Sequence, residues 1–323
     1  MKFHEAANFL FDLRRYPPRP GTDATAALLD HLGNPHETVD CIQIAGSNGK
    51  GSTARMVESV LREAGLSVGL YTSPHLDDVR ERIRVDGRKL PESALTAFVT
   101  EIESYVTDRA ADGEAPTFFE TLTALSLWEF GRREVDVAVL EVGIGGRHDA
   151  TSVVDPIAGA VTSVALEHTD VLGDTVEEIA RDKAHVAPAD RPLVCGADAA
   201  ARAAITDEIG EILTVGGPGD DVAVAYGGRD GLESIVSLDG TGWTVETHLP
   251  LLGEHQAQNA GIAAALVRQV ADVSDETLGR GLRNAHWPGR FELLGEDPLL
   301  VLDGAHNPKG CERVAETLAD FEY

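Results

Sequence analysis

The sequence predicts an α/β protein with a mostly parallel sheet flanked by helices. Two observations predict it. Apolar runs of strand length alternate with segments of helical period, and polar residues follow the ends of several apolar runs. With 323 residues, the chain can hold one large domain or two ordinary ones.

The elements of the first two thirds follow from these periodicities. We expect strands at 39–45, 67–72, 135–142, 157–164 and 192–195, and helices from about 53, at 92–106 and at 119–131. The first helix places Met56, Val57 and Val60 on one face. It stops at Gly65, a typical residue just past a helix end.

The last third changes character. Residues 214–250 contain GGPG, GGRDG and DGTG turns between short apolar runs, which predicts a small antiparallel β segment. Helices at 255–270 and 275–283, a strand at 299–302 and a helix at 308–318 follow. A single strand and helix cannot bury both faces of a parallel strand. We therefore expect a main domain at 1–292 and, at 293–323, the first unit of an incomplete second domain with a Rossmann-like fold.

The charge balance excludes some partners. Asp and Glu number 54 against 27 Lys and Arg, so the formal net charge is −27. Such a charge repels the phosphates of nucleic acids and anionic lipids, and we expect neither as a partner. Only five positive residues are lysines, and an acidic, lysine-poor surface suggests adaptation to high salt. An ordinary acidic bias is the alternative.

Cysteine usage and hydropathy indicate the compartment. Cys41, Cys195 and Cys311 lie far apart and form neither a C-x-x-C pair nor a secreted disulfide framework. The first 15 residues interrupt their apolar residues with polar ones, so they contain no signal-peptide core. No later apolar run is long enough to span a bilayer. We expect a cytoplasmic protein.

Residues 44–53, IAGSNGKGST, form a candidate phosphate loop. The segment lies between a predicted strand and a predicted helix, so backbone N–H groups can surround an oxyanion while Lys50 reaches the outer phosphates. It departs from G-x-x-x-x-G-K-[ST], because Ile44 replaces the first glycine and Gly51 separates Lys50 from Ser52. A chance glycine-rich turn is the alternative, but strand, loop, lysine and helix together favour a P-loop-type nucleotide site.

Two further motifs place oxygen ligands at strand ends, where open α/β sheets bind ligands. YTSPHL offers Ser73, and VLEVGIGGRHDAT places Glu141 at the end of an apolar strand. A carboxylate beside a phosphate loop is well placed to bind Mg²⁺. Taken alone, YTSPHL is as consistent with a plain turn, and Asp149 with a helix cap.

A third strand end carries His168, within SVALEHTDVLG and next to Glu167. A lone histidine is more often structural than a ligand, but its place at a third strand end favours a metal ligand. Lys183, within ARDKAHV, would ordinarily be a solvated helix lysine.

Three motifs late in the chain are LGEHQAQNA, WPGRFE and LDGAHNP. They contribute Asn259, Arg290, Asp303 and His306. Each of these could alone be a cap or turn residue. Asp303 ends an apolar strand and precedes Gly304, which suits a ligand-contacting loop.

Together these motifs resemble the dihydrofolate synthase/folylpolyglutamate synthase family of the muramyl-ligase-like enzymes. The resemblance follows one order along nearly the whole chain: GSNGKGS, YTSPHL, ERI at 81–83, TFFE at 117–120, EVGIGGRHDAT, LEHTDVLG, DKAHV, LGEHQ, WPGR and DGAHNP. The phosphate loop alone would allow any muramyl-type ligase, whereas TSPHL and TFFE point toward the folate branch.

The resemblance implies an ATP- and Mg²⁺-dependent ligase. It would phosphorylate a carboxylate of dihydropteroate or of a reduced folate, and the amine of L-glutamate would then displace phosphate. It would act with small molecules only, and we expect a monomer. The ATP phosphates would contact Ser47, Asn48, Gly49, Lys50, Gly51 and Ser52.

The other site residues are implied in the same way. One Mg²⁺ would be bound by Ser73 and Glu141, and a second by His168 and by Lys183 after carbamylation. Adenine, phosphate and ribose would contact Asn259, Arg290 and Asp303, with His306 as a further nucleotide contact. The pteroate would touch Thr117, His148, Asp149 and Ala150, with 19–22 as a further candidate segment. The catalytic residues would be Lys50, Lys183 and His168.

Three features depart from the family's pattern. His148 stands where the family usually has an apolar residue, and DKAHV replaces EKAGI, which puts His185 after the lysine. The family's C-terminal domain, which supplies the glutamate site and closes over ATP, is represented by one strand and helix. Two alternatives stay open: an inactive ATP- and pteroate-binding fragment of a longer, bifunctional folate-biosynthesis polypeptide, and a different muramyl-type ligase or P-loop phosphotransferase.

Overall fold

A computed structural model describes residues 1–17 and 19–321. The helices are α1 (Phe3–Asp12), α2 (Asp23–His31), α3 (Lys50–Glu63), α4 (Glu92–Ala111), α5 (Phe118–Arg132), α6 (Thr169–Leu172), α7 (Val176–Lys183), α8 (Ala199–Ile209), α9 (Glu254–Val270), α10 (Asp275–Arg283) and α11 (Pro308–Leu318). The strands are β1 (Asp40–Ala45), β2 (Val68–Tyr71), β3 (Ile83–Val85), β4 (Arg88–Lys89), β5 (Val137–Glu141), β6 (Ala158–Val161), β7 (Leu193–Cys195), β8 (Ile212–Gly216), β9 (Val222–Asp230), β10 (Glu233–Gly240), β11 (Trp243–Leu249), β12 (Glu292–Glu296) and β13 (Leu299–Leu302).

One large sheet organises the molecule, with strand order β11-β10-β9-β8-β7-β6-β1-β5-β2-β3-β4. The six neighbouring pairs from β9 to β2 are parallel, and the outer pairs are antiparallel. From β1 the chain continues to β2 on one side of the sheet and later to β6 on the other. Ligands of open α/β sheets bind at such a reversal, beyond the carboxyl ends of the strands.

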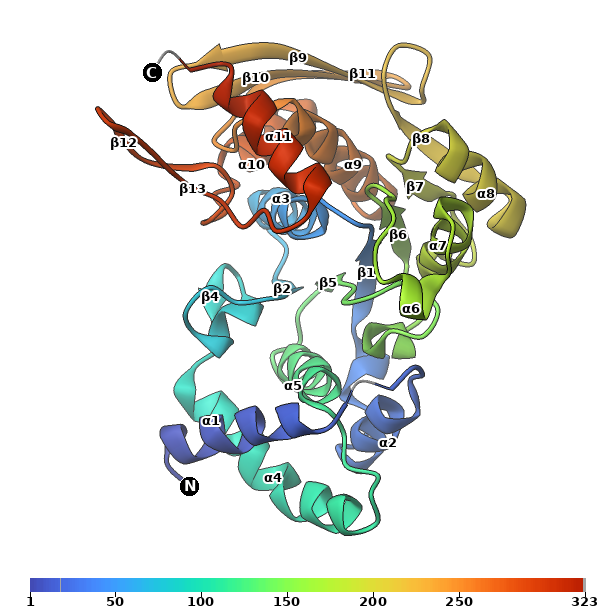
Figure 1. The fold of residues 1–323 in the computed structure, drawn as a ribbon, viewed down its shortest axis with the longest axis vertical. Coiled ribbons are helices and arrows are strands. Elements are labelled where there is room, and N and C mark those ends of the chain that lie inside the picture. The colour runs from blue at the N-terminus through green and yellow to red at the C-terminus, as the bar shows by residue number, and fades with distance from the viewer. Residues whose placement is uncertain (18, 322–323) are drawn as a thin grey trace.

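Alternation along the central strands buries both faces of the sheet. Ile42 and Ile44 of β1 pack in one core with α3, α9 and α10, whereas Cys41 faces a second core with α1, α2, α4 and α5. Successive side chains of a strand point to opposite faces, so a strand covered on both sides is apolar at most positions. In Figure 1, α1, α2, α4 and α5 lie together at the bottom of the view, while α3, α9, α10 and α11 gather at the top. No helix within the described residues combines the length and apolar character that crossing a membrane requires.

The predicted α/β class and mostly parallel sheet are confirmed. The antiparallel segment is also confirmed as β9, β10 and β11, which join the main sheet because β9 pairs with β8. The helix expected from about Thr53 begins earlier, at Lys50. Gly49 adopts a φ of 89°, so the chain enters the helix directly from the phosphate loop.

The last described segment is a hairpin followed by α11. The sequence predicted β13 but not β12, which begins at Glu292 and pairs antiparallel with β13. This two-stranded sheet is separate from the large one. Leu294, Leu300 and Leu302 are about half exposed on it, at 56%, 55% and 48%. The hairpin therefore presents apolar side chains that the described residues leave uncovered.

Candidate functional site

The candidate site lies where β1 ends and α3 begins. Gly46 and Gly49 have φ values of 143° and 89°, which L side chains rarely adopt. A Cβ atom on Gly46 would collide with Thr162, and one on Gly49 would collide with Asn259. Both glycines are thus required by the turn and by the close approach of β6 and α9.

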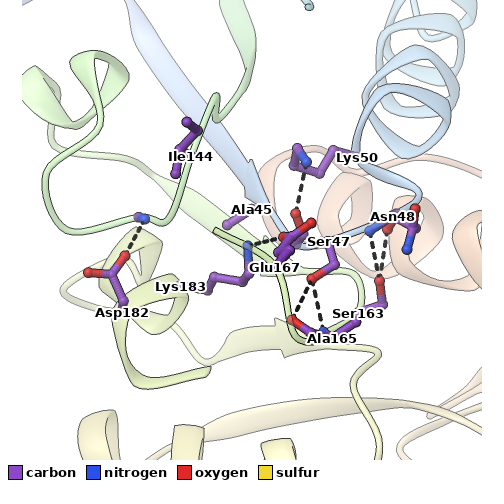
Figure 2. Close-up of polar contacts among 12 residues, drawn as sticks. Ala45, Ser47, Asn48, Lys50, Ile144, Ser163, Ala165, Glu167, Asp182 and Lys183 are labelled. Carbon is purple, nitrogen blue, oxygen red and sulfur yellow. Dashed lines mark hydrogen bonds and ion pairs between the residues drawn. The ribbon is translucent and has the colours of Figure 1, made fainter. Parts of the chain in front are cut away.

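The loop is held from the neighbouring strand end. The Ser47 hydroxyl accepts a hydrogen bond from the Ala165 backbone at 2.9 Å, and the Asn48 N–H donates to Ser163 Oγ at 3.0 Å. Figure 2 shows both contacts below the loop. Ser47 and Asn48, predicted as phosphate contacts, therefore have their backbone fixed before any ligand arrives.

Lys50 reaches back across the loop. Its Nζ donates to the carbonyl oxygen of Gly46 at 2.8 Å (Figure 2). Since the first N–H groups of a helix have no carbonyl partner within the helix, those of Lys50, Gly51 and Ser52 remain available at the start of α3. An ammonium group and a helix N-terminus side by side suit the phosphates of a nucleotide.

Glu141 lies opposite this helix start. It is 5% exposed, and its Oε2 accepts from the Ser73 N–H at 2.9 Å. Burial raises the pKa of Glu141, while Lys50 opposes that rise. A buried carboxylate of this kind gains from a nearby cation. The donor set of a carboxylate and the Ser73 hydroxyl next to a phosphate loop fits Mg²⁺, which takes oxygen ligands and retains waters.

The third strand end brings together Glu167, His168 and Lys183. His168 is exposed and has a φ of 48° at the start of α6. Lys183 is 1% exposed, and its Nζ donates to Glu167 Oε1 at 2.9 Å (Figure 2). Burial lowers the pKa of Lys183, whereas Glu167 raises it. In this ion pair Lys183 is a cation, and it would become a metal ligand only after losing that charge.

His185 does not contact this group. It pairs with Glu208 at 3.1 Å on the surface, and Arg147 lies against it. The bulky residue that follows Lys183 is therefore turned away from the candidate metal ligands.

The late motifs converge on the same loop. Asn259 lies against Gly49, and its Nδ2 donates to Gln256. Asp303 accepts N–H bonds from Phe291 and Ala305, both at 2.7 Å. These bonds fix the turn that carries Arg290 and His306.

A cavity of about 250 Å³ unites the predicted nucleotide and metal residues. Its lining includes Ser47, Asn48, Gly49, Lys50, Gly51, Ser52, Ser73, Glu141, His168, Asn259, Arg290, Asp303 and His306. Lys183 does not line the cavity, because Glu167 lies between the cavity and the lysine. Among the described residues, no group of three or more His, Cys, Asp or Glu side chains could hold a metal by itself.

The predicted pteroate residues lie outside this cavity. Thr117 caps α5, accepting from the Glu120 N–H. The Asp149 carboxylate is buried and accepts bonds from Gly143, Ile144 and Thr151. Asp149 thus has the cap role that the sequence offered as its alternative, and any contact with a pteroate stays a prediction.

The remaining pteroate candidates meet at one backbone contact. The Gly21 N–H donates to the carbonyl oxygen of His148 at 3.1 Å. This bond joins residues 19–22 to the segment that contains Ala150, as expected if both touch one ligand. Ala150 is buried, and the His148 side chain is exposed.

Sequence reasoning missed His255, Gln256 and Arg313, which also line the cavity. Burial and, to a smaller extent, the charge of Arg313 lower the pKa of His255 to about 4, so this imidazole is neutral near pH 7. Within LGEHQAQNA, the sequence pattern indicates Asn259 as a ligand contact but gives no reason to choose His255 or Gln256. Arg313 lies on α11 and gave no signal, because its place in the cavity depends on tertiary folding.

Comparisons with known proteins agree with this geometry. The model of the family described as "Mur ligase middle domain" matches residues 44–267. A Halobacterium salinarum protein named "Probable bifunctional folylpolyglutamate synthase/dihydropteroate synthase" is 64% identical over 100% of this chain. The chain spans only 40% of that relative's length.

Similarity extends to a shorter relative and to a solved structure. The folylpolyglutamate synthase of Lacticaseibacillus casei is 36% identical over 98% of this chain and 77% of its own length. A solved "FPGS-AMPPCP-folate complex" superimposes with a TM-score of 0.91 at 32% sequence identity, covering 100% of this chain and 82% of the other.

Proposed function

Since this chain belongs to the dihydrofolate synthase/folylpolyglutamate synthase family of muramyl-type ligases, we propose that it carries the ATP site of a glutamate ligase. The acceptor is dihydropteroate, a reduced folate, or both. The observation that supports this most directly is the cavity that joins the phosphate loop, Glu141 and Asn259. In the solved relative the ligands are AMPPCP and folate.

The reaction follows from carboxylate chemistry. A carboxylate is a poor electrophile at neutral pH, and transfer of the ATP γ-phosphoryl group gives an acyl phosphate with a good leaving group. The amine of L-glutamate attacks the acyl carbon, phosphate departs, and an amide forms. Phosphoryl transfer needs positioning and charge neutralisation more than covalent help from the protein. Lys50 and the loop N–H groups supply both.

Mg²⁺ would be held by Glu141 and Ser73, and it neutralises charge on the transferring phosphoryl group when bound. Glu141 is already buried beside the phosphate loop, where its carboxylate could bind the ion. His168 and a carbamylated Lys183 would hold a second ion. The burial of Lys183 supports this, because it favours the neutral amine that carbamate formation requires.

We further propose that residues 293–323 begin a C-terminal domain that continues in a longer polypeptide. The exposed Leu294, Leu300 and Leu302 support this proposal, as does the greater length of the Halobacterium relative. Amide hydrogen exchange tests it. The β12–β13 amides should be better protected in the longer polypeptide than in this chain, and equal protection would contradict the proposal.

The activity test is ADP release in high KCl with Mg-ATP, L-glutamate and either dihydropteroate or tetrahydrofolate, with the product identified by mass. A glutamylated product supports the ligase. ATP and pteroate binding without turnover would instead support an inactive binding fragment. ADP release with only a non-folate acceptor would support a different muramyl-type ligase.

The proposal includes a monomer in a reducing cytoplasm. Cys41, Cys195 and Cys311 are free thiols, which supports the compartment. Light scattering coupled to size-exclusion chromatography in high KCl measures the mass. A mass near 34.3 kDa is expected for the 323-residue chain.

A further inference from the structure

A cationic and aromatic cluster lies beside the candidate active site. Arg14 and Arg82 both lie over the ring of Phe118, with their guanidinium carbons 4.6 and 5.4 Å from its centroid. Phe11 stacks on Phe118 at 5.7 Å, and His75 lies edge-on to Phe11. The members come from α1 and its end, the TSPHL loop, the ERI motif and the start of α5.

Arg82 is unusual among the cations of this chain. Its side chain is buried, with 8% of the residue exposed, and no salt bridge to a described residue satisfies its charge. Its Nε donates to His75 Nδ1 at 2.8 Å. Within residues 1–17 and 19–321, neither terminal guanidinium nitrogen donates a hydrogen bond. The two outer nitrogens of Arg82 are therefore available to a partner that the described residues do not supply.

The acidic residues around His75 are already engaged. Asp78 and Glu81 face His75, but Asp78 pairs with Arg80 at 2.6 Å and Glu81 with Lys89 at 3.2 Å. Burial lowers the pKa of Arg82 and Arg14 lowers it further, whereas Tyr71 and Glu141 oppose the shift. Glu141 is close enough to act on Arg82, but neither arginine forms a salt bridge with a described carboxylate. In a chain with a net charge of −27, these two arginines therefore form a local site for an anion.

Three links connect this cluster to the reacting groups. The TSPHL loop carries Ser73, whose N–H holds Glu141, and two residues later His75, which holds Arg82. The Thr72 N–H donates to the carbonyl oxygen of Arg82 at 2.9 Å. Phe118 directly follows Thr117, a predicted pteroate contact. The cluster thus lies between the predicted Mg²⁺ ligands and the predicted pteroate residues.

We propose that Arg82 and Arg14, which both lie over the ring of Phe118, bind a carboxylate of the acceptor that does not react, namely the α-carboxylate of a glutamyl residue. This inference rests on the proposed ligase function. Dihydropteroate has only the carboxylate that reacts, whereas a pteroylglutamate carries a second one a short aliphatic chain away. A planar guanidinium can pair with that group through two N–H bonds. The cluster therefore favours folate over dihydropteroate as acceptor.

Equilibrium binding to the 323-residue chain tests the inference, in high KCl with Mg-AMPPCP present. The probes are tetrahydrofolate and dihydropteroate. Arg82→Gln should weaken tetrahydrofolate binding about tenfold or more, the loss expected for a charge-assisted pair, and change dihydropteroate binding less than about twofold. Arg14→Gln, at an exposed position that does not threaten folding, should weaken tetrahydrofolate binding selectively but by less. Arg88→Gln removes an exposed charge on β4, the strand that pairs with β3, and should change neither affinity.

Each outcome decides between the two proposals. Equal losses for both pteridines in the arginine variants, or no loss for either, would overturn the carboxylate site and leave the ligase proposal intact. Wild-type chain that binds neither pteridine would overturn the proposed function and this inference with it. Selective loss of tetrahydrofolate affinity in Arg14→Gln would support the inference even if Arg82→Gln fails to fold.

Discussion

The ammonium nitrogen of Lys183 lies 2.9 Å from Glu167 Oε1, at a position where the lysine is 1% exposed. Burial lowers the pKa of Lys183, and Glu167 works in the opposite direction. Burial acts to raise the pKa of Glu167, but the neighbouring charge of Lys183 lowers it, and the pKa lies below its usual value. The ion pair between Lys183 and Glu167 must therefore break before the Lys183 amine can react with CO₂.

Lys183 should form a carbamate that depends on pH and bicarbonate. Only the neutral amine attacks CO₂, so carbamate should increase as pH rises through the lowered pKa of Lys183. We expect the wild-type chain to give a ¹³C carbamate signal with labelled bicarbonate. The Lys183→Arg variant should lack this signal and should lose ligase activity by about 100-fold or more. Lys309→Arg serves as the exposed control. A signal that persists in Lys183→Arg would place the carbamate elsewhere.

Lys50→Ala should abolish activity and leave the fold intact. Lys50 contributes its charge to the loop and, among the described residues, its side chain donates only to Gly46, so its loss removes phosphate stabilisation without opening the core. We expect ATP affinity to fall by about tenfold or more, since a charge-assisted contact is lost. Calorimetric titration and circular dichroism measure the two effects, with Lys2→Ala as the surface control. Near-normal turnover in Lys50→Ala would contradict the phosphate-loop assignment.

Glu141→Gln should stabilise the ligand-free chain while removing its response to Mg²⁺. Burial raises the pKa of Glu141, so the folded state holds this proton more tightly than the unfolded state does. The associated stability is full below the unfolded pKa, about 4.3, and is lost as pH rises through the raised value. Glu141→Gln has no carboxyl group to ionise at this position, so the variant does not lose this stability as pH rises.

The gain in unfolding free energy should be about 1 kcal/mol or more at pH 7.5 and vanish near pH 4. Urea titrations at the two pH values measure it. Asp149, also buried with a raised pKa, is unchanged in the variant and cancels from the difference. An equal effect of Glu141→Gln at both pH values would contradict the proposed linkage.

The central sheet and most of the nucleotide site were predictable because local patterns determine them. Apolar runs identified β1 and β5, and the strand ends then identified Glu141 and the phosphate loop. The ion pair between Lys183 and Glu167 was not predictable, since the two residues come from different elements and neither motif signals the other. β12 was missed because ELLGE is short and gains its pairing only from β13.

The same limit applies to the Arg82 cluster. The ERI motif belonged to the resemblance, but nothing in its spacing predicts that Arg82 meets Phe118, because the contact joins the turn before β3 to the start of α5 and depends on tertiary folding. Asp149 illustrates the converse. Its cap role was a local alternative, and the structure uses its carboxylate for backbone N–H groups within a few residues.

Stability should rise with KCl concentration. Two electrostatic effects oppose each other: screening weakens the repulsion caused by a net charge of −27, and it also weakens the surface ion pairs. Exposed pairs such as Arg280 with Glu63 contribute little, since such pairs typically stabilise by less than about 1 kcal/mol. The Debye length falls from about 10 Å at 0.1 M to about 3 Å at 1 M. Salt should therefore weaken the repulsion between neighbouring carboxylates by more than it weakens the attraction within the ion pairs.

The Tm from thermal unfolding should increase between 0.1 and 2 M KCl by roughly 10 °C or more, the shift that a few kcal/mol produces in a chain of this size. Sucrose at matched osmolality, which adds no ions, should raise it less, and a Tm that stays constant across the KCl series would show that the acidic surface is not an adaptation to salt.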